Sequence, residues 1–140
     1  MALKVRRVDV YAAPVDNKPG GAAEKLNILA AAGAYLETVY ATRNADLPSG
    51  AMMAVSPLKG SEQIKAAREA GFIKVEDAFL VRVEGTDRKG RGAEITQALA
   101  DARLNLAGLS AAVIGKKFVC YIMLDTEAAA KKAMRVLKKL

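Results

Sequence analysis

Apolar residues recur along the chain with two different periods, and these periods predict its elements. Short apolar or β-branched runs predict strands, whereas apolar residues at i, i+3, i+4 and i+7 predict helices. In the first half, strands are expected at 5–15, 35–43, 51–55 and 72–75, and helices at 22–32 and 61–71. In the second half, strands are expected at 79–84, 106–114 and 118–124, and helices at 93–102 and 126–137.

The two halves contain the same passage, 70 positions apart. Asn17-Lys18-Pro19-Gly20 is repeated as Asp87-Arg88-Lys89-Gly90, and each copy lies between a predicted strand and a predicted helix. The residues that follow at matching distances are Glu24, Leu29-Ala30 and Leu36 in the first copy and Glu94, Leu99-Ala100 and Leu106 in the second. The repeat indicates that one small module was duplicated.

Each module is predicted to have the ferredoxin-like order strand–helix–strand–strand–helix–strand, in the α+β class. We expect antiparallel sheets with helices on one face, and modules at 1–77 and 78–140. Only Lys138-Lys139-Leu140 follow the last helix, so the second module is predicted to lack its last strand. It should then expose a sheet edge that a partner chain or a swapped segment covers, which favours an oligomer. Both faces of the strand at 5–15 are apolar, which predicts packing on each face.

Composition excludes several classes of function. Hydrophobic residues make up 52% and charged residues 26%, as in ordinary soluble proteins, and no apolar run is long enough to span a membrane. We therefore expect a cytoplasmic protein. The chain has no histidine, which excludes His-based triads and His-ligated metals, and its one cysteine, Cys120, lies in an apolar run that predicts a buried thiol. We expect no enzyme activity, no metal and no cofactor.

The net charge of +7 raises the question of nucleic-acid binding. Much of the excess lies near the C-terminus, where cations complement the carbonyl end of a helix. These residues are Lys131, Lys132, Arg135, Lys138 and Lys139. Aromatic residues are only 5% and there is no Trp, so no platform for base stacking is indicated. Specific nucleic-acid binding is not expected.

The repeated pattern resembles the ACT domain. Asn17-Lys18-Pro19-Gly20 and Asp87-Arg88-Lys89-Gly90 resemble the Asp-Arg-Pro-Gly turn of that family. Ala102-Arg103-Leu104-Asn105-Leu106 is similar to its Ala-Gly-Ile-Asn-Ile segment, and in the first copy Tyr35 stands in place of the asparagine. The resemblance covers nearly all of the chain as two tandem modules.

The resemblance implies a regulatory protein that binds a small amino acid, without catalysis of its own. Such modules pair side by side into larger sheets and hold the ligand at the seam. We expect a homodimer, or a subunit that regulates an enzyme or a transcription factor. Two departures bear on this: Asn17 replaces an acidic residue in the first turn, and Lys89 replaces a proline in the second. They leave open whether one copy or both bind.

The glycine turns supply the chemistry for this function. Unpaired N–H groups at a helix start suit a ligand carboxylate, and glycine lets a ligand approach them. Asp87 or the side-chain oxygen of Asn17 would take the ammonium, while the strand starts at Tyr35 and Asn105 would shape the side-chain pocket. The full predicted ligand-binding set is Asn17, Pro19, Gly20, Gly21, Tyr35, Leu36, Asp87, Arg88, Gly90, Arg91, Asn105 and Leu106. In the alternative, the glycines only allow tight turns and Asn17 and Asp87 cap the helices.

The sequence raises three other functions. The first is an interaction module that docks a partner through its open sheet edge and its basic C-terminal helix. The second is RNA binding on the exposed face of a ferredoxin-like sheet. The third is a phosphate loop at Gly85–Gly92, but this segment lacks the Gly-Lys-Ser/Thr ending that would hold phosphate and Mg²⁺, so no nucleotide site is expected.

Overall fold

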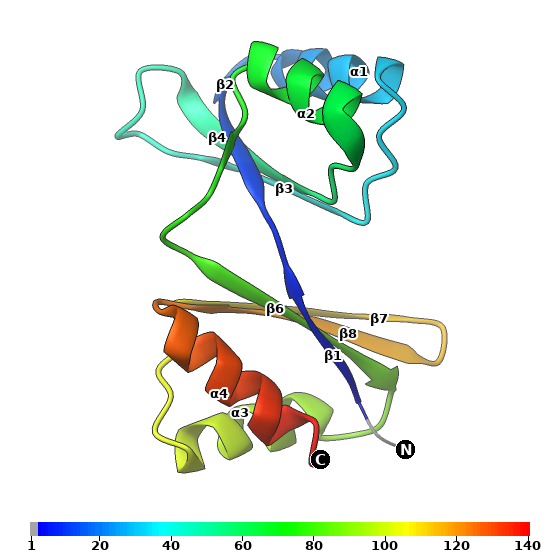
Figure 1. Ribbon diagram of the computed structural model, residues 1–140, viewed down its shortest axis with the longest axis vertical. Coiled ribbons are helices and arrows are strands. Elements are labelled where there is room, and N and C mark those ends of the chain that lie inside the picture. Colours follow the sequence, from blue (N-terminus) through cyan, green and yellow to red (C-terminus); the bar gives the residue numbers. More distant parts are fainter. Residues whose placement is uncertain (1–2) are drawn as a thin grey trace. The chain divides into compact units, whose positions relative to one another are not determined.

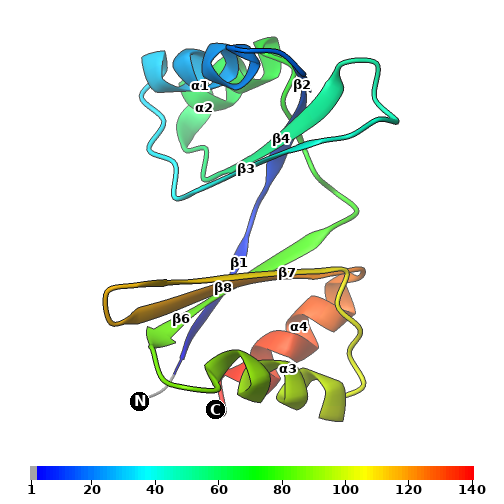
Figure 2. The same cartoon turned by 180° about the vertical axis from the view of Figure 1, so that it is seen from behind.

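The structure is a computed structural model that describes residues 3–140. The chain divides into two compact units, one formed by Asp9–Val75 and the other by β1 (Lys4–Val8) together with Glu76–Leu140. We call them the 9–75 unit and the 76–140 unit. Each has one four-stranded antiparallel sheet with two helices on one face (Figures 1 and 2). The predicted α+β class and the two tandem modules are confirmed.

The 9–75 unit has the sheet order β3-β4-β2-β5. Its elements are β2 (Tyr11–Asp16), α1 (Gly21–Ala31), β3 (Thr38–Arg43), β4 (Gly50–Ser56), α2 (Gly60–Glu69) and β5 (Ile73–Lys74). Alternate residues of β2 and β4, such as Ala13 and Met53, are buried together with Leu29 of α1 and Phe72. The period-2 pattern of the strands and the helical pattern of α1 thus meet in one core.

The 76–140 unit has the sheet order β1-β6-β8-β7. Its remaining elements are β6 (Phe79–Thr86), α3 (Arg91–Asp101), β7 (Gly108–Ile114), β8 (Lys117–Leu124) and α4 (Glu127–Leu137). Val81 and Ile122 of the two central strands are fully buried with Leu99 of α3 and Leu137 of α4. Cys120 lies in the same core, 1% exposed, and burial raises the pKa of its thiol to about 11. The prediction of a buried thiol is confirmed.

The expected strand at 5–15 is in fact two strands in two sheets. β1 pairs antiparallel with β6, from Lys4 opposite Glu84 to Val8 opposite Leu80, whereas β2 pairs with β4 and β5. Asp9 and Val10 separate them. The segment is apolar on both faces because its two parts serve different cores, with Leu3 and Val5 packing in the core of the 76–140 unit.

β1 fills the place of the last strand that the second repeat lacks. In residues 3–140 no strand follows α4. The edge beside β6 that was expected to be covered by a partner chain or a swapped segment is covered by β1 of the same chain, and Arg7 of β1 also pairs with Glu127 of α4 at 3.1 Å. The argument for an oligomer that rested on this edge is lost with it. β1 was also expected in a first module of 1–77, whereas it groups with residues 76–140.

Among residues 3–140, no helix combines the length and the apolar character that crossing a membrane would require. The longest helices have 11 residues. A helix that spans a bilayer needs about 20.

Candidate functional site

The two glycine turns have the same backbone geometry. Gly20 has φ 85° and ψ −7°, and Gly90 has φ 81° and ψ 8°. Both lie in the left-handed region that favours glycine, and each is the N-cap residue of the helix that follows. The repeated sequence therefore marks a repeated conformation.

Neither helix start is capped by a side chain. The alternative in which Asn17 and Asp87 cap α1 and α3 is therefore wrong. The first intrahelical bonds are donated by the amides of Glu24, to Gly20 at 3.0 Å, and of Glu94, to Gly90 at 2.9 Å. The helices themselves offer no acceptor to the amides of residues 22, 23, 92 and 93, which carry the partial positive charge of a helix start.

Each turn is held against the hairpin that joins the two following strands. The amide of Asn17 donates to the carbonyl of Ser49 at 2.9 Å, and that of Asp87 donates to the carbonyl of Lys116 at 2.8 Å. Asn17, Pro19, Gly20, Asp87, Arg88 and Gly90 are all exposed. Both turns therefore present an open surface at the hairpin end of their unit.

The predicted strand starts lie at the other end of each unit. Tyr35 and Leu36 follow the C-terminal end of α1, and Asn105 and Leu106 follow that of α3. Each helix has 11 residues, about 16 Å of length, between the turn and the strand start. Leu36 and Leu106 pack against the cores of their units, and Asn105 is exposed. Within one unit, the structure does not bring the two halves of the predicted site together.

A shallow cavity of about 340 Å³ lies at the start of β3. Tyr35, Glu37, Pro57, Lys59 and Gln63 line it, and Tyr35 is 86% exposed. Gln63 is held by two hydrogen bonds, one donated to the carbonyl of Gly33 at 3.0 Å and one accepted from the amide of Lys59 at 2.8 Å. This end of the unit thus offers an exposed ring beside an acidic and a basic residue.

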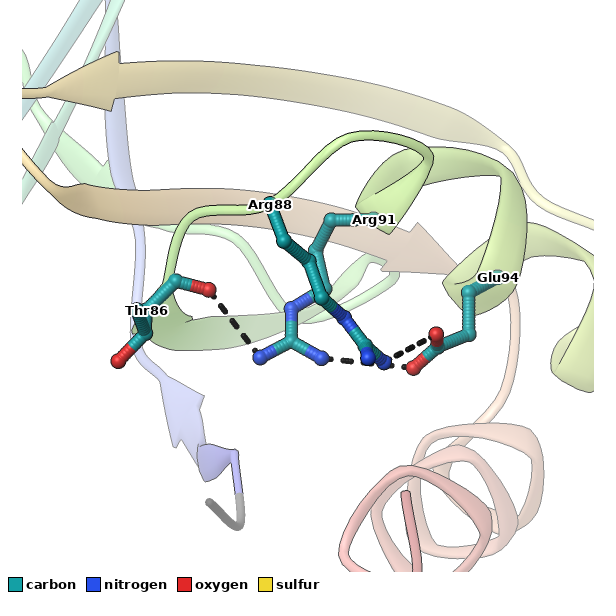
Figure 3. A network of polar contacts seen from close by, with 4 residues as sticks. All are labelled: Thr86, Arg88, Arg91 and Glu94. Atoms are coloured by element: carbon teal, nitrogen blue, oxygen red, sulfur yellow. Dashed lines mark hydrogen bonds and ion pairs between the residues drawn. The ribbon is translucent and has the colours of Figure 1, made fainter.

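In the 76–140 unit, the side chain of Arg91 fills the space beside the second turn. Arg91 is only 5% exposed, and its Nη2 donates to the carbonyl of Thr86 at 3.1 Å. Its Nη1 lies 3.4 Å from Oε1 of Glu94, and Arg88 binds the other oxygen of the same carboxylate (Figure 3). Hydrogen bonding to Arg88 lowers the pKa of Glu94. Arg88 and Arg91, both predicted to contact a ligand, are bound within the unit.

The first turn has a cavity instead. Gly21, the counterpart of Arg91 in the repeat, lines a cavity of about 290 Å³ together with Pro14, Asp16, Glu24, Lys25, Ser49 and Gly71. Of these residues only Gly21 was predicted as part of a site. The repeated glutamate, Glu24 and Glu94, was the signal in the sequence that pointed to this place.

The strands β3 and β7 each form one edge of their sheet, opposite the edge strands β5 and β1, and are paired on one side only. β7 carries Leu109, Val113 and Ile114, which are 51%, 51% and 73% exposed, and it contains no charged residue or proline. Charged residues and prolines are the usual protection of a free edge against pairing, and β7 has neither. β3 exposes Val39 and Tyr40.

Comparison with known protein families gives a sequence match for fewer than half of the residues. Residues 77–140 match the family model of the ACT domain. No curated protein matches the chain.

Solved structures resemble the whole chain in fold. Protein BT0572 from Bacteroides thetaiotaomicron has a TM-score of 0.78 at 14% identity, over 96% of this chain and 89% of that one. The ligand-free regulatory subunit of aspartate kinase from Thermus thermophilus has a TM-score of 0.68 at 18% identity, over 99% and 96%. Aspartokinase III from E. coli, solved with aspartate and ADP, has a TM-score of 0.61 at 18% identity, over 96% of this chain and 32% of that one.

Proposed function

Because residues 77–140 are an ACT domain and both units have its fold, we propose that this protein is a regulator that binds a small amino acid and catalyses no reaction. Ligand binding would favour one arrangement of paired modules over another. A coupling of about 1–3 kcal/mol between ligand and partner suffices for control. The regulated partner would be an enzyme or a transcription factor of the cytoplasm.

The observation that carries the proposal is the pair of uncapped, glycine-led helix starts. Gly20 and Gly90 leave amides at the starts of α1 and α3 without a side-chain acceptor, in turns that are exposed. An amino-acid carboxylate satisfies such amides and is attracted by the helix dipole. Asp87 is exposed beside the second turn and is suited to the ligand ammonium.

Pairing of free edges from two chains would complete the site. When two edge strands pair antiparallel, the start of one lies beside the end of the other. β3 and β7 end at the hairpins that hold the glycine turns, and they start after Tyr35–Leu36 and Asn105–Leu106. The strand start of one chain would thus approach the turn of the other, which no single unit achieves. The occupant of each free edge is a second copy of this chain.

A thermal-shift screen with the twenty amino acids, followed by calorimetry, tests ligand binding. A ligand present at 100 times its Kd adds about 2.7 kcal/mol to the stability of the folded state. Aspartate should be tested first, since the structure of E. coli aspartokinase III was solved with it. Gly20→Val and Gly90→Val should weaken binding by placing a side chain over the amides. A flat response across the panel would refute the proposal.

Sedimentation analysis tests the pairing of edges. Lysine substitutions at Leu109 and Val113 in β7 should convert a dimer into a monomer, because lysines on an edge strand oppose its pairing with another strand. Ala100→Lys on the exposed side of α3 is the matched control and should leave the dimer intact. A wild-type protein that stays monomeric at high concentration would contradict the proposed pairing of edge strands between two chains.

The distribution of charge favours a second function, the docking of an acidic partner by the 76–140 unit. Five cations on and just after α4 are exposed: Lys131, Lys132, Arg135, Lys138 and Lys139. Charge reversal at Lys131, Lys132 and Arg135 would abolish binding to an acidic partner and leave amino-acid binding unchanged. The opposite result, in which the turn variants alone lose function, would favour the first proposal.

A further inference from the structure

The two units treat the same place behind the glycine turn differently. Positions 16, 21 and 24 of the 9–75 unit correspond to positions 86, 91 and 94 of the other. In the 76–140 unit, position 91 is an arginine, and Thr86 and Glu94 bind its guanidinium group. In the 9–75 unit, they line an open cavity. We propose that this cavity is a binding site for the guanidinium or ammonium group of a small ligand.

The 76–140 unit shows what this place binds. The Arg91 guanidinium lies between the carbonyl oxygen of Thr86 and the carboxylate of Glu94 (Figure 3). Arg91 is 5% exposed, so these two acceptors are what keeps its charge compensated inside the unit. A carbonyl and a carboxylate on either side of a planar cation form a guanidinium site that the chain itself fills.

In the 9–75 unit, the residue equivalent to Arg91 is Gly21, which has no side chain to fill the cavity. A Cβ on Gly21 would lie 2.1 Å from the carbonyl oxygen of Asp16, so a side chain at this position would require the backbone to shift. The cavity of about 290 Å³ has room for on the order of ten non-hydrogen atoms. A group that occupies it must therefore come from outside the chain.

The charges around the cavity favour a cation. Asp16 and Glu24 supply two carboxylates, and Lys18 approaches Asp16 only to 3.6 Å with both side chains exposed. The one cation in the lining, Lys25, donates its ammonium to the carbonyl of Ala70. Within residues 3–140 Glu24 has no ion pair, whereas its counterpart Glu94 has two arginines. A ligand cation would replace the arginine that Glu24 lacks.

This inference goes beyond the proposed function, because the cavity lies inside one unit and needs no pairing of chains. The test therefore uses the monomeric Leu109→Lys, Val113→Lys variant, so that failure of the seam does not affect it. The probes are L-arginine and guanidinium chloride, with L-citrulline as the uncharged analogue and NaCl for ionic strength. Binding is followed by calorimetry and by amide chemical shifts in NMR.

We expect saturable binding of arginine or guanidinium with one site per chain, and shifts centred on Asp16, Gly21 and Glu24. Citrulline should bind at least tenfold more weakly. Glu24→Gln should lower the affinity at least tenfold, whereas Glu62→Gln, on the exposed start of α2, should leave it unchanged. Absence of saturable binding, or equal binding by the Glu24→Gln variant, would overturn the inference.

A second variant asks whether the two places are equivalent. Arg91→Gly removes the internal guanidinium and should lower the melting temperature, and millimolar guanidinium chloride, but not NaCl, should restore part of it. The number of cation sites per chain should rise from one to two. If rescue occurs in this variant while the wild type binds no cation, the 76–140 unit alone recognises guanidinium and the inference fails.

Discussion

The 9–75 unit contains seven Lys or Arg and seven Asp or Glu residues, whereas the 76–140 unit contains 15 and 8. The whole net charge of +7 is therefore carried by one of two units that share a fold. The same unit has its glycine turn occupied by Arg91, while the neutral unit keeps a cavity there. Duplication has given one copy in which an arginine of the chain fills this place and one that has room for a ligand.

The units also differ in how their sheets are closed. In the 9–75 unit, β5 contributes two residues, Ile73 and Lys74, and both are exposed. In the 76–140 unit, β1 contributes five residues in register with β6, flanked by the buried Leu3. The strand that closes this edge of the sheet is therefore short and exposed in the 9–75 unit, whereas it is a substantial part of the 76–140 unit.

Removal of residues 1–8 is the change with the largest expected effect. Burial of Leu3 and Val8 alone is worth about 1.5–3 kcal/mol each, and the backbone pairing of β1 is lost with them. Since a domain is stable by only about 5–15 kcal/mol, the 76–140 unit should unfold. Cys120 belongs to this unit and is buried, so its labelling by a thiol reagent reports that event alone.

The control for this truncation is Ile73→Ala in β5, which should cost below about 1 kcal/mol because Ile73 is 69% exposed. Cys120 should stay unlabelled in that variant. Protection of Cys120 after removal of residues 1–8 would show that β1 is dispensable, and the difference between the two closing strands would disappear.

The first turns of α1 and α3 each contain a glycine, Gly21 as the first residue of α1 and Gly92 as the second residue of α3. Gly21→Ala should destabilise the 9–75 unit by about 2–3 kcal/mol, because its Cβ would meet the Asp16 carbonyl at 2.1 Å. Gly92→Ala meets nothing within 4 Å and should stabilise the 76–140 unit by up to about 1 kcal/mol through helix propensity. Urea denaturation measures both, and equal effects of the two substitutions would contradict the structural difference between the turns.

The second residue after α1 and the second residue after α3 show a smaller contrast. Arg103 has φ 61°, in the left-handed region, where the first repeat has Gly33 with φ 86°. Arg103→Gly should therefore stabilise the protein by about 1 kcal/mol, and Gly33→Ala should destabilise it by about the same amount. Denaturation curves of the two variants give both signs, and a loss of stability in Arg103→Gly would show that the backbone there is not strained.

The smallest expected effect is a dependence on pH. The hydrogen bond from Arg88 lowers the pKa of Glu94 below its value of 4.5 in an unfolded chain. Glu94 therefore contributes stability above about pH 4.5, and this contribution is lost as the pH falls through its lowered pKa. Wild type should exceed Glu94→Gln in stability at pH 7, and the difference should shrink at pH 3. A difference independent of pH would mean that the carboxylate charge is unimportant.

The helices and most strands could be predicted because their apolar periods are regular. The repeat predicted the two turns; α1 starts one residue before its expected position and α3 two residues before, each directly after Gly20 or Gly90. The strand at 5–15 could not be divided correctly, since the apolar run continues through Val8 and Val10 and nothing local shows that its two parts pair in different sheets.

The candidate site was predicted only in part. Its glycines were found, but the burial of Arg91 was not, because an arginine beside two glycines ordinarily extends into solvent. The cavity depends on residues brought together from four separate segments, including Gly71 and Ser49. Because these segments are far apart in the sequence and follow no regular spacing, the cavity could not be predicted from it.

The pairing of β1 with β6 makes the 9–75 unit an insertion within another domain. Val8 lies opposite Leu80, so the two ends that flank the inserted unit are already neighbours in one antiparallel ladder. A short hairpin loop from Val8 to Glu76 would therefore join them and yield a four-stranded domain with continuous connections. Excision of the insert, rather than a cut at the midpoint of the chain, is the way to separate the two halves.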